Sequence, residues 1–135
     1  MIMKGKYFFL SNFFPCLLRD VDFPDITYQS VEAAFQAAKV TTRSERAAFS
    51  DADPSTAKRL GRRVRLRPDW ESIKDSVMEQ YLRQKFSSPQ LAAQLKAVTE
   101  PIVEDNTWGD RYWGRCNGYG RNRLGQLLEK IKAEI

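Results

Sequence analysis

The chain has 135 residues, of which 42% are hydrophobic and 29% charged, and this composition predicts one globular domain spanning residues 1–135. It contains no histidine, which excludes the most common general base and the most common metal ligand, so acid–base chemistry falls to Asp, Glu, Lys or Tyr. The net charge of +5 favours an anionic partner without separating a nucleic acid from a phosphorylated metabolite.

The ends and cysteines of the chain predict its compartment. No signal peptide is recognisable, and no segment approaches the roughly 18 apolar residues of a membrane span. We therefore expect a cytoplasmic protein that does not contact a membrane. Cys16 and Cys116 lie far apart in a cysteine-poor chain, so reduced thiols are expected instead of a disulfide framework.

Two extended regions are predicted first along the chain. Residues 6–10 are apolar and aromatic and predict a short strand. Residues 21–23 and 26–28 alternate around a turn at Pro24-Asp25 and predict a hairpin. The remaining segments favour helices. The predicted fold class is therefore mainly α and multihelical, with a minor β-hairpin component near the N-terminus.

The first helix is predicted to begin after Ser30, a good N-cap residue, and to run to Lys39. Its apolar residues recur with helical spacing and form a core stripe. Glu32, Gln36 and Lys39 form a second stripe beside the apolar one, so these side chains can face a cleft at the edge of the core. A solvated face with a weak charge pair explains the same pattern.

A short helix is predicted from Pro54 to Leu60, with Gly61 at its carboxyl end. The most basic stretch of the chain overlaps it and contains Lys58, Arg59, Arg62, Arg63, Arg65 and Arg67. A phosphate-binding surface and a solvated charged face both explain this stretch. The candidate phosphate ligands are Arg59, Arg62 and Arg63.

Asp69 is expected to cap a long helix that ends near residue 86. Most of its apolar residues belong to the core. Trp70 and Lys74 are i, i+4 neighbours, close enough for the lysine stem to lie along the indole.

The last third of the chain contains two predicted helices separated by an aromatic segment. One helix runs from Ser88 to about Val98, residues 102–104 are expected to be extended, and Asn122 begins the final helix. Residues 105–123 hold two tryptophans, two tyrosines and four glycines without regular periodicity. Because such a segment cannot bury a regular apolar face and is too aromatic for a disordered linker, we expect a binding loop.

Six dispersed motifs, in order along nearly the whole chain, resemble the NADAR family, also called YbiA-like proteins. The motifs are Phe9-Leu10-Ser11-Asn12-Phe13-Phe14-Pro15, Tyr28-x-Ser30-x-Glu32-x-x-x-Gln36-x-x-Lys39, Ala57-Lys58-x-Leu60-Gly61 with Val64, Asp69-Trp70 to Lys74 and Met78, Ile102-x-Glu104 with Asp105-x-x-Trp108-Gly109, and Gly120-x-Asn122-x-Leu124-Gly125. Each motif is weak alone, but their shared order and spacing are hard to obtain by chance.

The resemblance implies an N-glycosidase that cleaves the bond between a phosphorylated ribose and the exocyclic amine of a base. One implied substrate is guanine whose exocyclic amine carries ADP-ribose, with a DNA ADP-ribosyltransferase toxin as a functional partner. The other is a phosphoribosylamino-pyrimidine intermediate of riboflavin biosynthesis. No cofactor and no metal are expected. The alternative is a non-catalytic module that binds ADP-ribose or nucleic acid.

The resemblance places catalysis on Glu32 and Lys39, and on a loop acid, Asp105 or Asp110. A glycosylamine can open to an imine, so Lys39 is the candidate nucleophile for transimination. Direct attack by water activated by a carboxylate is the competing route. Lys39 needs a dry pocket or a neighbouring cation to lower its pKa, and Lys74 is a candidate for that cation.

The expected substrate-binding residues come from both halves of the chain. They are Asn12, Phe13, Gln36, Trp70, Lys74, Trp108, Trp113 and Asn122, with Tyr112 as a further candidate for stacking on the base. The loop tryptophans also suit a purely structural role in closing the core. Capping of the last helix also explains Asn122.

Overall fold

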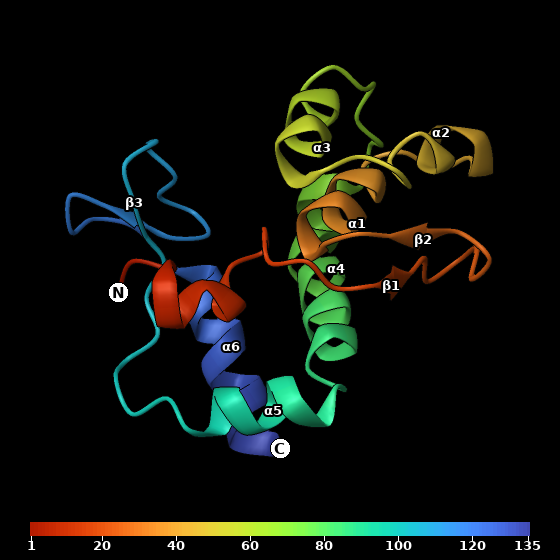
Figure 1. Cartoon of the computed structure of the whole chain (residues 1–135). Helices are drawn as coiled ribbons and strands as arrows, with labels where there is room; N and C mark the ends of the chain where they lie inside the picture. Colours follow the sequence, from red (N-terminus) through yellow and green to blue (C-terminus); the bar gives the residue numbers. More distant parts are fainter. The chain divides into compact units, whose positions relative to one another are not determined.

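The computed structural model describes residues 1–135, and it confirms the predicted fold class, mainly helical with small two-stranded sheets (Figure 1). Its elements are the 3₁₀ helix η1 (Gly5–Leu10), β1 (Leu18–Arg19), β2 (Thr27–Tyr28), α1 (Val31–Ala37), α2 (Arg43–Ala47), α3 (Pro54–Gly61), α4 (Trp70–Lys85), α5 (Pro89–Lys96), β3 (Asp105–Asn106), β4 (Arg115–Cys116) and α6 (Arg123–Glu134). None of these helices combines the length and hydropathy needed to cross a bilayer.

The chain divides into two compact units. One unit is Asn12–Lys85, and the other combines Met1–Ser11 with Phe86–Ile135. The prediction of a single domain over residues 1–135 stays a prediction. Each unit has its own buried helix faces, which position different candidate site residues.

Helix α1 is central to the Asn12–Lys85 unit and packs against α3, α4 and the β1–β2 sheet (Figure 1). As predicted, Ser30 caps this helix, because its Oγ accepts the N–H of Ala33 at 3.1 Å. Every residue of α1 is buried, including Glu32 and Gln36. The interpretation of the Glu32–Gln36 stripe as a solvated face was therefore wrong.

The predicted hairpin exists, but its strands differ from those expected. Leu18–Arg19 pairs antiparallel with Thr27–Tyr28, and residues 21–23 belong to the connection between them. The carboxylate of Asp20 accepts the backbone N–H groups of Asp22 and Phe23, at 2.8 and 2.9 Å. These hydrogen bonds fold the chain into a turn at the position where a strand was predicted.

The strand predicted at residues 6–10 is a 3₁₀ helix over Gly5–Leu10. Gly5 has a φ of +57°, which turns the chain away from an extended path. Phe9 and Leu10 are buried consecutively. A short apolar run does not distinguish a strand from one buried helical turn, which is why the prediction was wrong.

Helices α3 and α4 begin close to the predicted positions. Asp53 caps α3 by accepting the Thr56 N–H at 2.7 Å. Asp69 directly precedes α4, but its carboxylate binds the Arg67 guanidinium at 2.7 and 3.2 Å, while its backbone carbonyl accepts the Ser72 N–H. The start of α4 is thus linked to the end of the basic stretch.

In the second unit, α5 packs against α6. Ser88 caps α5 through the Leu91 N–H, and α6 buries the predicted apolar stripe of Leu124, Leu127, Leu128 and Ile131. Residues 105–122 contain no helix, and β3 pairs in parallel with β4 inside them. Residues 102–104 precede β3 without joining a sheet.

Candidate functional site

The predicted stripe on α1 forms a buried polar cluster. Gln36 Nε2 donates a hydrogen bond to Glu32 Oε1 at 2.9 Å, and the backbone N–H of Glu32 donates to the carbonyl of Asn12 at 3.1 Å. Glu32 is only 9% exposed to solvent. A carboxylate held in this way has a restricted orientation, which suits a group that moves protons at one fixed position.

Two buried amide oxygens in this cluster have no hydrogen-bond partner, Oδ1 of Asn12 and Oε1 of Gln36. Asn12 Nδ2 donates to the sulfur of Met78 at 3.6 Å, so only the oxygen of this amide lacks a partner. Buried acceptors are normally paired, and an orphaned one often marks a place for water or a ligand donor. Gln36 donates to the Glu32 carboxylate, and the Asn12 backbone carbonyl accepts the Glu32 N–H, so both unpaired oxygens belong to residues that contact Glu32.

Lys39 was predicted to be the last residue of this helix, but α1 ends at Ala37, so Lys39 lies in the turn that follows and is half-buried. Burial lowers the pKa of its ammonium group, the negative charge of Glu32 raises it, and the positive charge of Arg62 lowers it further, so that the pKa lies below its ordinary value. A larger fraction of Lys39 is therefore neutral, which a nucleophilic amine requires.

Trp70 provides an aromatic wall for Lys39. Its ring is buried at 5% exposure and packs against Phe35 with the ring centroids 5.0 Å apart. Lys39 Nζ lies 6.0 Å from the Trp70 ring. The cation acting on the pKa of Lys39 is Arg62 and not the predicted Lys74, which forms an ion pair with Glu71 at 2.6 Å.

The three candidate phosphate ligands, Arg59, Arg62 and Arg63, are exposed, and their guanidinium groups form no ion pair. Arg67 differs from them. Its backbone N–H donates to the carbonyl of Lys39 at 3.0 Å, and its side chain binds Asp69. Arg67 therefore anchors the chain that follows α1, and the other three arginines remain available to an anion.

The two loop acids in the second unit have partners of their own. Asp110 Oδ1 accepts the N–H groups of Tyr112 and Trp113 at 3.0 and 2.9 Å, and its backbone exchanges two hydrogen bonds with the Asn106 amide. The carboxylate of Asp105 accepts from the Met1 ammonium at 2.6 Å. Asp110 thus shapes the loop, and no group of acidic or cysteine side chains is placed to hold a metal ion.

The candidate aromatic residues differ in exposure. Trp108 is 59% exposed, whereas Trp113 is half-buried and packs edge-on against Tyr112 at 4.9 Å. More than half of the Trp108 side chain is thus accessible to solvent, and closing the core does not explain it. Phe13, predicted to bind substrate, is half-buried next to Asn12.

Asn122 does not cap α6, in contrast to one prediction. It has a left-handed backbone with φ 52°, and its side chain makes no capping hydrogen bond. Instead, Nδ2 donates to the carbonyl of Ile102 and Oδ1 accepts the N–H of Glu104, both at 3.0 Å. The side chain therefore ties the start of α6 to residues 102–104.

Gly61 is not among the predicted site residues, although it touches the cluster. As predicted, Gly61 lies at the carboxyl end of α3, although the cap is Arg62 and Gly61 has no positive φ. A Cβ at position 61 would lie 1.9 Å from Gln36 Oε1. Its lack of a side chain is thus explained by the close approach of α3 to α1, which periodicity does not reveal.

Comparison with known proteins identifies the family of the chain. Residues 2–135 match the model of the NADAR domain. The chain is 37% identical over 114 residues to the N-glycosidase YbiA of Shigella boydii, covering 81% of this chain and 71% of that protein. It is 32% identical over 132 residues to the riboflavin biosynthesis protein VVA0006 of Vibrio vulnificus, covering 94% of this chain and 35% of that protein. The NMR structure of the Escherichia coli protein YbiA matches with a TM-score of 0.84 and 34% identity, covering 99% of this chain and 81% of that one. The chain therefore belongs to the NADAR domain family and is an N-glycosidase of the YbiA type.

Proposed function

We propose that the chain hydrolyses the bond between C1 of a phosphorylated ribose and the exocyclic amine of a base. The observation that carries this proposal is the buried Glu32 carboxylate on α1, whose negative charge acts on Lys39, a half-buried lysine just beyond the helix with a pKa below its ordinary value. The unpaired buried oxygens of Asn12 and Gln36 support a ligand that brings its own donors, such as ribose hydroxyls.

The chemistry of a glycosylamine suits these groups. Its ring opens to an imine at C1, and the neutral amine of Lys39 adds to that carbon. Glu32 moves the proton released by the Lys39 nitrogen to the exocyclic nitrogen of the base, and the base departs as a neutral amine. Water then adds to the remaining lysine imine, which releases the sugar and regenerates Lys39. In the competing route, Glu32 activates water for direct attack on C1.

The first proposed substrate is guanine that carries ADP-ribose on its exocyclic amine. The exposed, unpaired guanidinium groups of Arg59, Arg62 and Arg63 and the net charge of +5 support a polyanionic substrate. Trp108, with its exposed ring, stays a predicted residue for stacking on the base. A DNA ADP-ribosyltransferase toxin as functional partner stays a prediction that depends on this substrate.

The second proposed substrate is a phosphoribosylamino-pyrimidine intermediate of riboflavin biosynthesis. The name of the Vibrio vulnificus relative, a riboflavin biosynthesis protein, supports it. The bond to be cleaved is of the same kind in both substrates, so the roles of Glu32 and Lys39 are unchanged.

The test is a mass-spectrometric assay of sugar release from an oligonucleotide with ADP-ribose on guanine, and from the free pyrimidine intermediate. Wild type is expected to release the sugar, and Glu32→Gln to lose about 10²–10⁴-fold in kcat. The matched control is Glu45→Gln, which removes an exposed carboxylate on α2. Release from the pyrimidine alone would select the second substrate. Tight binding of both without turnover would establish the non-catalytic module.

Borohydride reduction during turnover distinguishes the two routes. The lysine route predicts a sugar covalently bound to Lys39 in wild type and no adduct in Lys39→Arg, because a guanidinium does not form the imine. Full turnover without any trapped adduct would favour direct attack by water.

A further inference from the structure

Four exposed residues of the 105–123 loop have no part in the proposed reaction: Arg111, Arg115, Tyr119 and Arg121. We call them the Arg–Tyr cluster. Residues 111–123 contain four arginines and no acidic residue. Tyr119 is 71% exposed, although its ring is a large apolar surface. An exposed ring among uncompensated cations is more typical of a binding surface than of a surface facing only solvent.

The backbone brings the three arginines together at Gly120. This residue has a φ of +148°, and a Cβ built on it would lie 3.0 Å from the Cα atoms of both Arg111 and Arg115. The N–H of Arg121 donates to the carbonyl of Arg111 at 2.8 Å. Three segments of the loop therefore cross where only glycine fits, and each carries an arginine at the crossing.

A tight turn fixes the position of Tyr119. Asn117 and Gly118 both have positive φ, at 54° and 80°, and Cys116 and Tyr119 exchange two backbone hydrogen bonds at 2.9 and 3.1 Å. An Asn-Gly pair with this geometry closes a two-residue hairpin turn. A tyrosine has only two side-chain torsions, so a ring presented in this way loses little entropy on binding.

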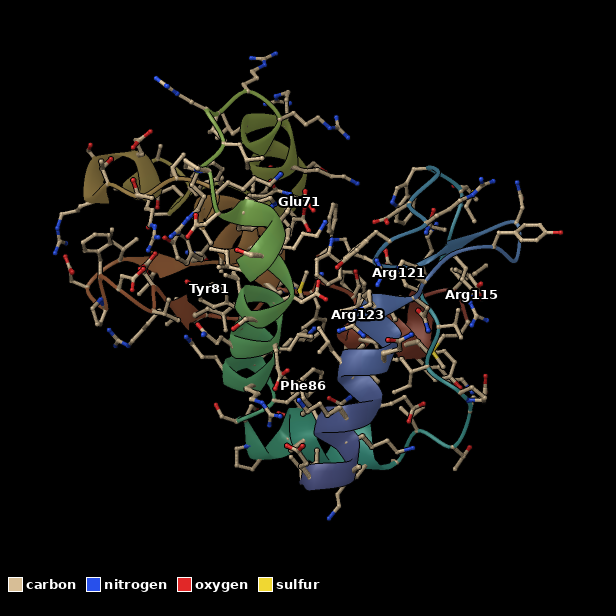
Figure 2. The ribbon with its side chains drawn as sticks, turned by 180° about the vertical axis from the view of Figure 1, so that it is seen from behind. Glu71, Tyr81, Phe86, Arg115, Arg121 and Arg123 are labelled. Carbon is tan, nitrogen blue, oxygen red and sulfur yellow. The ribbon has the colours of Figure 1, made fainter.

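The guanidinium groups of the cluster are free to bind anions. None of Arg111, Arg115 and Arg121 forms an ion pair, and the Arg121 guanidinium lies over the Tyr112 ring at 4.9 Å, which orients it. Figure 2 shows Arg115 and Arg121 on this loop, beyond the start of α6, where Arg123 is labelled. The nearest acid in sequence, Asp110, accepts two backbone N–H groups.

We infer that the Arg–Tyr cluster binds a segment of single-stranded nucleic acid. The arginines contact successive phosphates, and the exposed face of Tyr119 stacks on an unpaired base. A single metabolite does not need three arginines on an open surface, and a base in a paired duplex does not present its face. This inference rests on the proposed function only in giving the strand a purpose, because a guanine that carries ADP-ribose in a nucleic acid is part of such a strand.

The test measures binding of a fluorescent oligothymidylate of about 15 nucleotides by anisotropy across a salt series. Such a strand contains no guanine and is not a substrate. The variants are Arg115→Gln/Arg121→Gln, Tyr119→Ala and Tyr119→Phe. The matched control, Lys4→Gln/Lys96→Gln, removes two exposed cations from the same unit.

The double arginine variant is expected to weaken binding and to reduce the slope of log K against log salt by about 1.4, because each lost phosphate contact on a single strand removes about 0.7. Tyr119→Ala is expected to bind about fivefold more weakly or worse, and Tyr119→Phe to bind as the wild type does. Equal losses in the lysine control would overturn the inference. Preference for anionic phosphatidylglycerol vesicles over the oligonucleotide would overturn it as well.

Activity separates this result from failure of the proposed function. Turnover of a nucleotide-sized ribosylamine is expected to be unchanged in the double arginine variant, because these residues have no part in the proposed reaction. Loss of oligonucleotide binding with intact turnover supports the cluster. An active enzyme whose wild type does not bind the oligonucleotide refutes the cluster and leaves the glycosidase intact.

Discussion

Gly61 of α3 packs directly against Gln36 of α1, where a Cβ on residue 61 would lie 1.9 Å from Gln36 Oε1 and 2.7 Å from its Cδ. With its oxygen against the glycine, the amide directs Nε2 to Glu32 Oε1 at 2.9 Å. The glycine of α3 thus makes room for the Gln36 amide, and this amide orients the Glu32 carboxylate on α1. Gly61 is therefore a positioning residue, which acts through Gln36.

Gly61→Ala is expected to reduce kcat by about 10²-fold, because the displaced amide no longer fixes Glu32 and small misplacements of this kind are costly. Its free energy of unfolding is expected to change much less. Alanine favours a helix by up to about 1 kcal/mol over glycine, which offsets part of the about 1–3 kcal/mol that overpacking costs. Steady-state kinetics and urea denaturation measure the two effects separately.

A double-mutant cycle with Gln36→Ala provides the control. Removing the Gln36 side chain removes the clash, so Gly61→Ala/Gln36→Ala is expected to be no less active than Gln36→Ala alone. Losses that simply add would show that Gly61 acts through a different contact.

Arg62→Gln is expected to move the pH profile of kcat/KM to higher pH. Lys39 must be neutral to attack, so in the lysine route activity rises as pH rises through its pKa, which burial and Arg62 hold below the ordinary value. Removing the Arg62 charge raises that pKa. Arg65→Gln, an exposed arginine of the same stretch, is the matched control. An identical rising limb in Lys39→Met would contradict the assignment to Lys39.

Arg46→Met is expected to destabilise the fold by about 3–5 kcal/mol, because it leaves the Asp20 charge buried without its partner. The two side chains are 4% and 1% exposed and lie 3.0 Å apart. Equilibrium denaturation at neutral pH measures this loss. Arg43→Met removes a comparable ion pair with Asp25 that lies fully on the surface, and it is expected to cost little.

The same pair predicts an acid dependence of stability. Burial raises the pKa of Asp20, but the Tyr28 hydroxyl at 2.5 Å, two backbone N–H groups and Arg46 together hold it below the usual range. Its contribution is therefore complete above the unfolded value of about 3.9 and is lost as pH falls through the lower folded pKa. The difference in unfolding free energy between wild type and Arg46→Met is expected to shrink over that fall, and a constant difference would refute the linkage.

Asn122→Ala is expected to lower the free energy of unfolding by about 1–3 kcal/mol for each backbone group that loses its partner, namely the Ile102 carbonyl and the Glu104 N–H. Asn117→Ala is the matched control, because Asn117 also has a positive φ but is exposed. Thermal denaturation of both variants isolates the two hydrogen bonds from the backbone strain. If Asn122 only binds substrate, KM will rise and stability will match that of the control.

Local signals were sufficient wherever one segment decides its own structure. Ser30 caps α1 as predicted, and Asp53 and Ser88 cap the helices that were predicted to begin at them, because the acceptor and the N–H lie within one turn. Helical periodicity likewise placed Glu32 and Gln36 on one stripe of α1, whereas Lys39 lies beyond its end. The family motifs identified the NADAR domain without any spatial information.

The remaining features depend on contacts between segments distant in the chain. Periodicity could not decide whether the Glu32 stripe is solvated, because that depends on the packing of α3 and α4 against α1. Side-chain contacts that periodicity does not reveal also explain three other features. These are the turn at residues 21–23, the hydrogen bonds of Asn122 to residues 102–104, and the packing of Gly61 against Gln36. The sequence by itself determined the family and the approximate positions of α1, α3, α4, α5 and α6, and it nominated Glu32 and Lys39 as reactive side chains. Only the tertiary structure decided which of them are buried together, because burial and the lowered pKa of Lys39 arise from neighbours that the local sequence does not specify.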